Sequence, residues 1–432
     1  MEVGRTLGLF LVICPLALLL YTNTRGAAWQ AGPRTRDDAA RSASCTVRET
    51  SRRNLVVEGA RLLYVEPAVV NANRRGDVLL LGTPNYLSDA AAGQGSAREP
   101  AAYGVLGAIV PRNGPPRTVR GPVEAKLISG VRAAARADGR WDVVFAEIKP
   151  WTKFPPPDTA VRLWHGVYDG SRWTSLAELP LPAAGVLHPY FSSSLAQKGD
   201  TLAWALRTTS PGGGSDVVIY ERRAGVWSHE VLRTENTAYV ELAYLGSLGL
   251  TAAIVQPDRT VPYDENSLFF YARQPGWQAL GKIIHGGSEP VHQVSLNPAA
   301  DGTWLTWWSA VREETGVRRE ARTMLQAPGA STMKLGNISQ SIVPVMPGDG
   351  RRLWVSDHMD PRSRRRELRF LRDSAGSGTV LGRFPNPFEG RFLATALPGG
   401  ELLIAGPQLD RSAGVLTTLL LRARLECRAR TG

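Results

Sequence analysis

Carboxylates, phenols, histidines and one arginine recur in this sequence where a polar loop runs into an apolar segment. The segments read YVEPAVV, PVEAKLI, LHPYFSSS, AYVELAY, EPVHQVSLN, ISQSIVP and FEGRFLAT. Their polar residues are Glu66, Glu124, His188, Tyr190, Tyr239, Glu241, Glu289, His292, Gln340, Glu389 and Arg391. Converging carboxyl groups can divide the acid and base roles of glycosidic chemistry according to their spacing. The alternative is that these groups line a water-filled channel.

The candidate residues fall into a catalytic and a ligand-binding set. The catalytic candidates are Glu66, Glu241, Glu289, Tyr190, Tyr239 and Arg391. The ligand-binding candidates are Trp151, Phe154, Tyr263, His188, His292 and Arg391. Several of the second set lie in long loops such as KPWTKFPPPDTA and QPDRTVPYDENS, where aromatic residues accompany Asp, Asn or Arg. This combination suits sugar stacking and hydrogen bonding, although an aromatic residue can equally anchor its own loop.

Metal and cofactor signatures are missing from the sequence. His188 and His292 could ligate a metal only if loops brought them together, and their spacing matches no known motif. We find no HExxH, no GxSxG, no phosphate-cradling glycine-rich loop and no zinc-type cysteine pairs. The sequence therefore predicts no metal and no cofactor, and it leaves open whether the protein is an enzyme.

A glycine-centred turn followed by an apolar strand recurs along the chain. The copies are NRRGDVLLLGT, RADGRWDVVFAEI, QKGDTLAWALRT, PAADGTWLTWWSAV, PGDGRRLWVSD and LPGGELLIAGP, with YLGSLGLTAAIVQ in the one long interval. Their turn glycines are Gly76, Gly139, Gly199, Gly246 or Gly249, Gly302, Gly350 and Gly400. We expect tryptophans of the second strand, such as Trp304, Trp307 and Trp308, to pack between neighbouring sheets.

Each unit continues through a polar loop, a third strand, a tight turn and a fourth strand. Trp173, Trp227 and Trp277 stand at matching places near the start of the fourth strand. Four strands per period of roughly 40 to 65 residues predict an all-β, seven-bladed β-propeller, with six blades as the alternative count. The predicted blades span residues 58–121, 122–184, 185–235, 236–287, 288–337, 338–385 and 386–427. The turns after strands one and three should form one face, and the longer, more varied loops the other.

The last predicted blade lacks a fourth strand, because GVLTTLLLRARLEC runs almost to the end of the sequence. The early segment CTVRETSRRNLVV is a spare strand that could complete it. This closure would bring Cys45 beside Cys427 and remove an open sheet edge. We therefore predict a Cys45–Cys427 disulfide, the alternative being two unrelated thiols.

The N-terminal residues have the pattern of a secretory signal: Arg5, an apolar run over residues 7–20, and small residues ending at Ala28. An uncleaved membrane anchor is the alternative. The predicted organisation is a signal or anchor over 1–28, a linker over 29–44, one propeller over 45–427 and a tail over 428–432. We expect an exported monomer that is periplasmic, cell-surface or extracellular and meets the membrane only through an uncleaved N-terminal segment.

The formal net charge is +12, with 51 basic and 39 acidic residues. A basic surface favours anionic partners, although an arginine-rich proteome produces the same balance. For an exported chain we expect a surface carbohydrate or protein as the partner, anionic ones included, and no nucleic acid.

The turns YDGSRW, RRAGVW and RQPGW resemble degraded copies of the Asp-box, S-x-D-x-G-x-x-W, of the sialidase-like propellers. In that family the box is structural and lies away from the active face. The enzymes of the family use an arginine triad, an early Arg-Ile-Pro motif, a Tyr/Glu pair and an Asp. The early region here reads YVEPAVV, and only Arg391 is well placed at the start of an inner strand. The resemblance implies Tyr190 or Tyr239 with Glu241 as the Tyr/Glu pair.

Two functions follow from these patterns. The first is an exported, non-catalytic recognition module that binds a surface glycan or a protein partner. The second is a sialidase-like glycoside hydrolase with its active site at the mouth of the channel.

Overall fold

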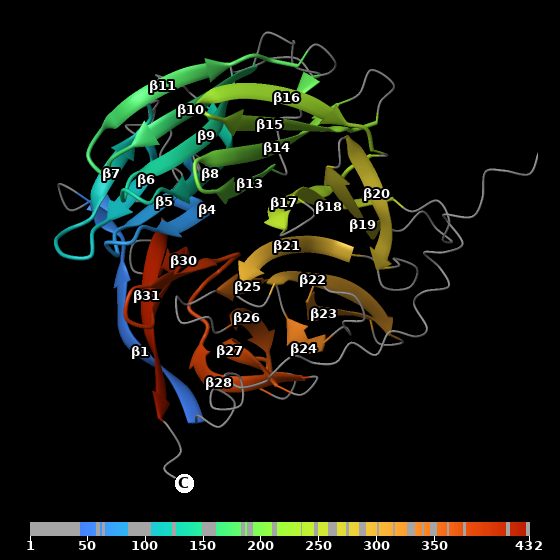
Figure 1. The fold of residues 1–432 in the computed structure, drawn as a ribbon. Helices are drawn as coiled ribbons and strands as arrows, with labels where there is room; N and C mark the ends of the chain where they lie inside the picture. The colour runs from blue at the N-terminus through green and yellow to red at the C-terminus, as the bar shows by residue number, and fades with distance from the viewer. Residues whose placement is uncertain are drawn as a thin grey trace, which may run out of the picture.

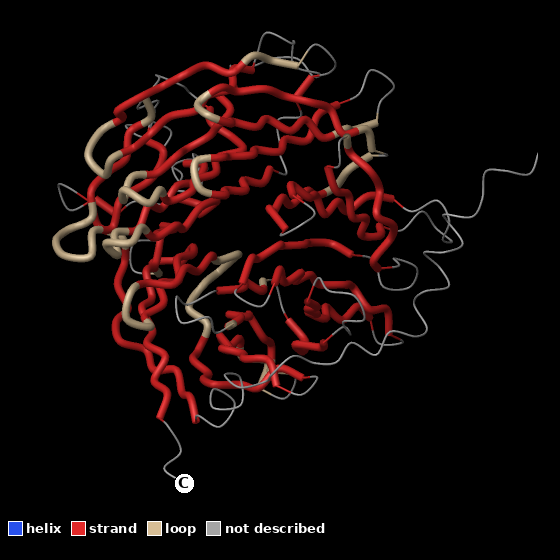
Figure 2. Tube along the Cα trace, in the orientation of Figure 1, coloured by secondary structure: helices blue, strands red, loops and turns tan. Residues whose placement is uncertain are grey.

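A computed structural model of the chain describes its strands and part of its loops. The described residues are 44–57, 61–62, 65–84, 105–122, 127–148, 161–182, 186–187, 193–209, 214–234, 236–245, 249–257, 266–273, 276–284, 291–299, 302–313, 316–325, 333–338, 341–345, 352–360, 363–374, 377–411 and 415–428. These residues form strands, turns and loops without a helix (Figure 2). The predicted signal segment lies outside them.

Seven antiparallel blades follow one another around a central axis, in chain order from blade 1 to blade 7 (Figure 1). A parallel pairing of Lys334 with Ser377 joins the outer strands of blades 5 and 6, so that these two blades form one eight-stranded sheet. Strands are given from the inner to the outer one of each blade. Blade 1 contains β4 (Val65–Ala72), β5 (Val78–Pro84), β6 (Val105–Val110) and β7 (Arg117–Arg120), and blade 2 contains β8 (Leu127–Ala135), β9 (Trp141–Ile148), β10 (Val161–Tyr168) and β11 (Trp173–Leu179). Blade 3 contains β13 (Ser193–Lys198), β14 (Thr201–Thr209), β15 (Val217–Arg223) and β16 (Val226–Leu232), and blade 4 contains β17 (Tyr239–Leu245), β18 (Gly249–Pro257), β19 (Asn266–Arg273) and β20 (Trp277–Ile284). A short strand, β12 (Val186–Leu187), also pairs with β14.

Blades 5 to 7 complete the ring. Blade 5 contains β21 (Val291–Ala299), β22 (Gly302–Glu313), β23 (Gly316–Leu325) and β24 (Met333–Ile338). Blade 6 contains β25 (Ile342–Val345), β26 (Leu353–Met359), β27 (Arg366–Ser374) and β28 (Ser377–Pro385). Blade 7 contains β29 (Leu393–Leu397), β30 (Glu401–Asp410), β31 (Val415–Arg428) and β1 (Ser44–Asn54). A small hairpin, β2 (Val56–Val57) with β3 (Arg61–Leu62), follows β1. The structure therefore confirms seven blades, with boundaries close to those predicted.

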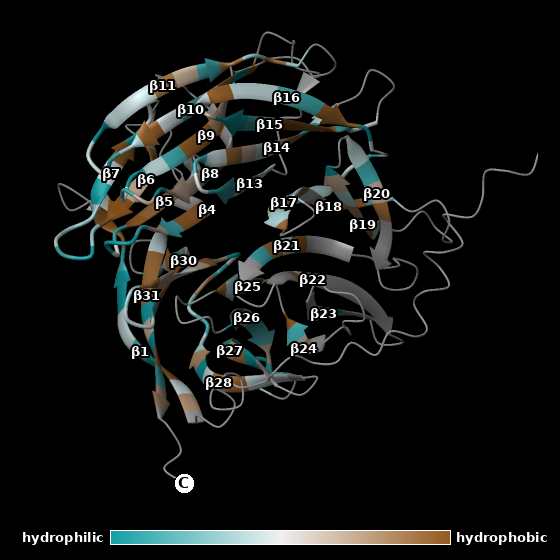
Figure 3. Cartoon of the chain, viewed as in Figure 1, coloured by the Kyte–Doolittle hydropathy of each residue, from teal (hydrophilic) through white to brown (hydrophobic). Residues whose placement is uncertain are grey.

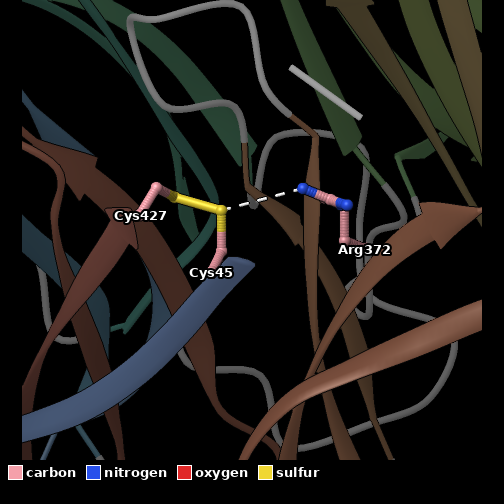
Figure 4. The surroundings of a disulfide bond; sticks show 3 residues. All are labelled: Cys45, Arg372 and Cys427. Carbon is pink, nitrogen blue, oxygen red and sulfur yellow. Dashed lines mark hydrogen bonds between the residues drawn. A yellow bond between two sulfur atoms is a disulfide. The ribbon is translucent and has the colours of Figure 1, made fainter. Parts of the chain in front are cut away.

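The N-terminal strand β1 is the outer strand of blade 7, antiparallel to β31 (Figure 1). Cys45 lies opposite Cys427 in this pairing, and the two form a disulfide that spans 382 residues of sequence. Figure 4 shows the bond beside Arg372, whose Nη1 lies 3.7 Å from Cys45 Sγ. A loop of this length can contribute up to about 5 kcal/mol in the chain-entropy model. The predicted closure of the ring is confirmed.

Glycines at the first hairpin turn allow the blades to form. Gly76, Gly139, Gly199, Gly249 and Gly400 all have positive φ, as the repeated turn motif predicts. At Gly139, with φ +88°, an added Cβ would also lie only 3.0 Å from Arg75 Nε of blade 1. Such a conformation strongly favours glycine.

Apolar packing joins every blade to the next, because one buried cluster bridges each pair of neighbours and another bridges blade 7 to blade 1. Trp141, Trp204 and Trp354 of second strands are fully buried. Trp354 Nε1 also donates to Thr306 Oγ1 of blade 5 at 3.0 Å. Second-strand tryptophans therefore pack between sheets as predicted, although the side chains of Trp304, Trp307 and Trp308 lie outside the described residues. Outer strands such as β11 are largely exposed and mix polar with apolar residues (Figure 3).

The turn between β10 and β11 contains the sequence YDGSRW. Asp169 Oδ1 accepts hydrogen bonds from the amides of Ser171 and Arg172, at 2.8 Å each, and from Ser171 Oγ at 2.7 Å. Trp173 Nε1 donates to the carbonyl oxygen of Arg120 in blade 1 at 2.8 Å. The turn therefore fastens the outer edge of blade 2 to blade 1.

Candidate functional site

Three inner strands bring a carboxyl, a hydroxyl and a guanidinium group together around the central axis. Glu241 of β17 accepts a hydrogen bond at Oε2 from Ser194 Oγ of β13, at 2.8 Å. The amide of Leu242 donates to the same hydroxyl at 2.9 Å. Because the Ser194 proton is engaged by Glu241, the hydroxyl is fixed between backbone and carboxyl. Arg132 of β8 interacts electrostatically with Glu241. We call Arg132, Ser194 and Glu241 the channel cluster.

Local structure places each member of the channel cluster. Arg132 follows a register shift that begins after Ser129 in β8, and its Nη1 donates to the Val131 carbonyl at 2.8 Å. Ser193, the neighbour of Ser194, donates to the Gly130 carbonyl at 3.1 Å and so ties blade 3 to blade 2. All three residues pair with the middle of their second strands, so they lie midway between the two faces of the propeller.

The electrostatics of the channel cluster favour a protonated carboxyl. Loss of hydration raises the pKa of Glu241 to about 7, and Arg132 and the Ser194 hydrogen bond oppose this only in part. Burial likewise lowers the pKa of Arg132, against the influence of Glu241. Among the described residues, Arg132 and Glu241 do not form an ion pair in direct contact. The carboxyl therefore changes its protonation near neutral pH, where a group can both donate and accept a proton.

Tyr239 and Arg207 lie one step nearer to the face that carries the varied loops, which we call the loop face. Tyr239 is two residues before Glu241 in β17, on the same side of the strand. Arg207 of β14 has a buried Nε without a hydrogen-bond partner in the described part of the chain. Burial lowers the pKa of Arg207 and Tyr239 acts in the opposite direction. This guanidinium can therefore still receive an anionic or hydroxyl-bearing group.

Charged groups of a different kind lie between the blades. Asp142 Oδ1 of β9 lies 2.8 Å from His165 Nε2. The same oxygen accepts a hydrogen bond from Arg222 Nη1 of blade 3 at 2.9 Å. Burial would raise the pKa of Asp142, but the hydrogen bonds from His165 and Arg222 outweigh it and hold the pKa below its usual value. Trp227 covers this group, with its ring centroid 5.1 Å from that of His165.

Glu221 of β15 repeats this arrangement one interface further along. Its carboxylate accepts from Arg273 and Tyr244 of blade 4, the latter at 2.9 Å, and from Arg223 at 2.9 Å. Burial alone would raise the pKa of Glu221, but the hydrogen bonds from these three donors have the larger effect and hold the pKa below its usual value. We call the groups around Asp142 and Glu221 the interblade clusters, and their full pairing marks them as structural.

The structure brings together two of the predicted candidates, Tyr239 and Glu241, on β17. Glu66 lies in β4 and His292 in β21, but only their backbone is described. Arg391 is exposed and lies between β28 and β29, as does Glu389. The remaining candidates lie outside the described residues: Trp151, Phe154, His188, Tyr190, Tyr263 and Glu289.

Arg132, Ser194 and Arg207 were not predicted from the sequence. Arg132 and Arg207 lie within β8 and β14, outside the segments that lead into the inner strands, whereas Ser194 ends one of those segments, LHPYFSSS. One signal was available: LISGVRAAA places a single arginine in an otherwise small and apolar strand. A charge in such a strand must be paired, solvated or functional.

The described residues contain no group of His, Cys, Asp or Glu that could hold a metal ion. The disulfide indicates an oxidising, extracytoplasmic environment. A helix with the length and apolar character needed to cross a bilayer is absent from the part of the chain that the structure describes.

Comparisons with known proteins reveal similarity in fold. No protein-family model matches the chain, and a search of curated proteins finds no relative. A protein of unknown function from Dyadobacter fermentans matches with a TM-score of 0.50 and 11% identity, over 88% of this chain and 100% of that one. The polysaccharide lyase Uly1 matches with a TM-score of 0.52 and 11% identity, over 86% of this chain and 92% of that one. A Hadza microbial sialidase matches with a TM-score of 0.42 and 10% identity, over 74% of this chain and 72% of that one.

At these identities the likeness concerns the fold alone. The chain shares the β-propeller fold, which is consistent with the predicted remote resemblance to the sialidase-like propellers.

Proposed function

We propose that this protein is an exported recognition propeller that binds an acidic surface glycan at the loop-face mouth of its channel. The observation that carries the proposal is that two guanidiniums, Arg132 and the half-buried Arg207, have no contact ion pair among the described residues. A partly desolvated cation without an anion in direct contact is costly, and a ligand carboxylate or sulfate would supply that contact. The net charge of +12 would draw such a ligand to the protein.

Binding rather than hydrolysis is favoured because Glu241 is the one carboxyl of the channel cluster in the described part of the chain. Glycosidases use two carboxyl groups held about 5 to 10 Å apart. Among the described residues, the groups that shift the pKa of Glu241 are Arg132 and Ser194, and neither is acidic. Tyr239 would donate a hydrogen bond to a sugar hydroxyl beside the anion.

A glycan array of the chain from about residue 29 tests this function. We expect binding to uronate-bearing or sulfated glycans, and replacement of Arg207 by Met should weaken it about tenfold. The matched control is Arg74→Met, because Arg74 is exposed at the opposite face. Equal weakening by both variants, or binding to protein partners without any glycan signal, would contradict the proposal.

The second candidate is a glycoside-active enzyme, favoured by the pKa of Glu241 near 7 and by Tyr239 on the same strand. A carboxyl with this pKa is suited to general acid–base catalysis at neutral pH. A panel of fluorogenic glycosides, sialosides included, should then be turned over, and Glu241→Gln should abolish turnover. Glu426→Gln, at an exposed position of β31, is the control. Absence of turnover across the panel would exclude this candidate for those substrates.

Export and its route are part of the proposal. The signal-like residues 1–28 and the disulfide support a periplasmic, cell-surface or extracellular location. N-terminal sequencing of the mature chain should find cleavage after Ala28, whereas an intact N-terminus in a membrane fraction would support an anchor.

A further inference from the structure

A cavity of about 590 Å³ opens at the loop face between blades 6 and 7, separate from the channel cluster. Three segments form it: the end of β1, the turn after β30 and the connection from β28 to β29. We call it the seam cavity, because it exists only where the N-terminal strand closes the ring. Its polar lining residues are Arg52, Asn54, Asn386, Glu389, Gln408 and Arg411.

The wall of the seam cavity around Asn386 is held rigidly. Asn386 Nδ2 donates to the fully buried Asp357 at 2.7 Å, and its amide donates to the Arg366 carbonyl at 2.9 Å. Arg366 in turn donates to Asp357 at 2.6 Å and to the Phe388 carbonyl at 2.8 Å. The amide of Phe388 donates a hydrogen bond to Asn386 Oδ1 at 2.9 Å. A wall fixed in this way loses little conformational freedom when a ligand binds.

The polar lining of the seam cavity consists entirely of planar groups. Guanidinium, amide and carboxylate side chains each offer two neighbouring donors or acceptors, which suits the adjacent hydroxyls of a sugar ring. Pro385, Pro387 and Leu409, which is 39% exposed, add apolar surface for the C–H face of that ring. Cavities of this size hold small ligands, such as a mono- or disaccharide.

The charges of the seam cavity are nearly balanced. Arg52 donates through Nε and Nη2 to both oxygens of Glu49, at 3.0 and 2.8 Å. Arg411 is exposed and shares the cavity with the carboxylate of Glu389. Hydroxyl groups therefore suit the cavity better than a net anionic charge, in contrast to the channel.

We propose that the seam cavity is a second carbohydrate site, which takes an uncharged sugar unit. It goes beyond the proposed function of the channel, and its existence does not depend on that function.

Saturation-transfer NMR of the mature, disulfide-bonded chain with lactose, cellobiose and xylobiose tests this site. We expect signal from at least one disaccharide, and a decrease of about fivefold in the double variant Arg411→Ala with Gln408→Ala. The control is Arg74→Ala on the opposite face, which should keep the signal. Arg207→Met accompanies it as a separate measure of sugar binding in the channel.

Three outcomes would overturn the seam site: no signal from any disaccharide, an equal loss in Arg74→Ala, or a loss confined to Arg207→Met. The last would assign all sugar binding to the channel and leave the proposed function standing. Conversely, a loss confined to the double variant supports the seam site even if the acidic-glycan array is negative.

Discussion

The channel cluster and the interblade clusters both bury charge, but they do so in opposite ways. Asp142 and Glu221 each meet several donors from two blades, and their pKa values lie below the usual range. Glu241 accepts one hydrogen bond, from Ser194, and Arg132 acts on it without direct contact. The pKa of Glu241 lies far above the usual range. The difference teaches that burial alone does not mark function. A fully paired charge holds the blades together, whereas an incompletely paired one is available for a ligand or a proton.

The largest expected effect comes from Asp142→Asn in the interblade cluster. Removing this carboxylate leaves Arg222 buried without its anion, and breaking a buried pair costs about 3 to 5 kcal/mol. Urea denaturation monitored by tryptophan fluorescence would measure the loss. Asp138→Asn, at an exposed pair with Arg140, is the matched control and should cost less than about 1 kcal/mol. Equal costs would remove the distinction between buried and exposed pairs.

A smaller loss should follow Arg273→Met in the second interblade cluster. Glu221 would keep Arg223 and Tyr244, so we expect about 2 kcal/mol. The same denaturation experiment measures it. If stability is unchanged, Glu221 does not need its partner from blade 4, and the structural assignment of this cluster fails.

The pH dependence of stability should differ in sign between the two regions. Glu241 has a folded pKa of about 7 against an ordinary value of 4.5, so between these values the folded chain holds a proton that the unfolded chain has released. Its contribution to stability therefore falls as pH rises from 4.5 to 7, by at most about 1.4 kcal/mol per pH unit. Asp142 has a lowered pKa, so its contribution is lost as pH falls below about 4.

Comparison of the wild type with Glu241→Gln isolates this effect. We expect the free energy of unfolding of the variant to increase relative to that of the wild type as pH rises from 5 to 8, as measured by denaturation curves. Parallel stability profiles over that range would contradict the raised pKa of Glu241.

The smallest effect should come from Arg207→Met, because this guanidinium has no hydrogen-bond partner at its buried Nε in the described residues. Replacement by an apolar side chain should change stability by less than about 1 kcal/mol, or raise it. Thermal denaturation checks this without ligand. A loss comparable to that of Asp142→Asn would show that Arg207 is structural and would weaken the proposed anion site.

The blade architecture of this protein follows from local signals in its sequence. Turn glycines such as Gly139 and fourth-strand tryptophans such as Trp173 carry local information, because a positive φ and an alternating strand constrain only their neighbours. Repetition of these local signals predicts the blades, and the spare strand with Cys45 predicts the closure.

Only the tertiary structure decided which polar groups meet. Arg132, Ser194 and Glu241 come from three different blades, and their meeting depends on a register shift in β8 and on how neighbouring blades pack. The pKa of Glu241 depends on burial by those same neighbours. A repeated pattern describes each blade alone, whereas the channel and the seam cavity arise between blades, where no local signal in the chain specifies the contact.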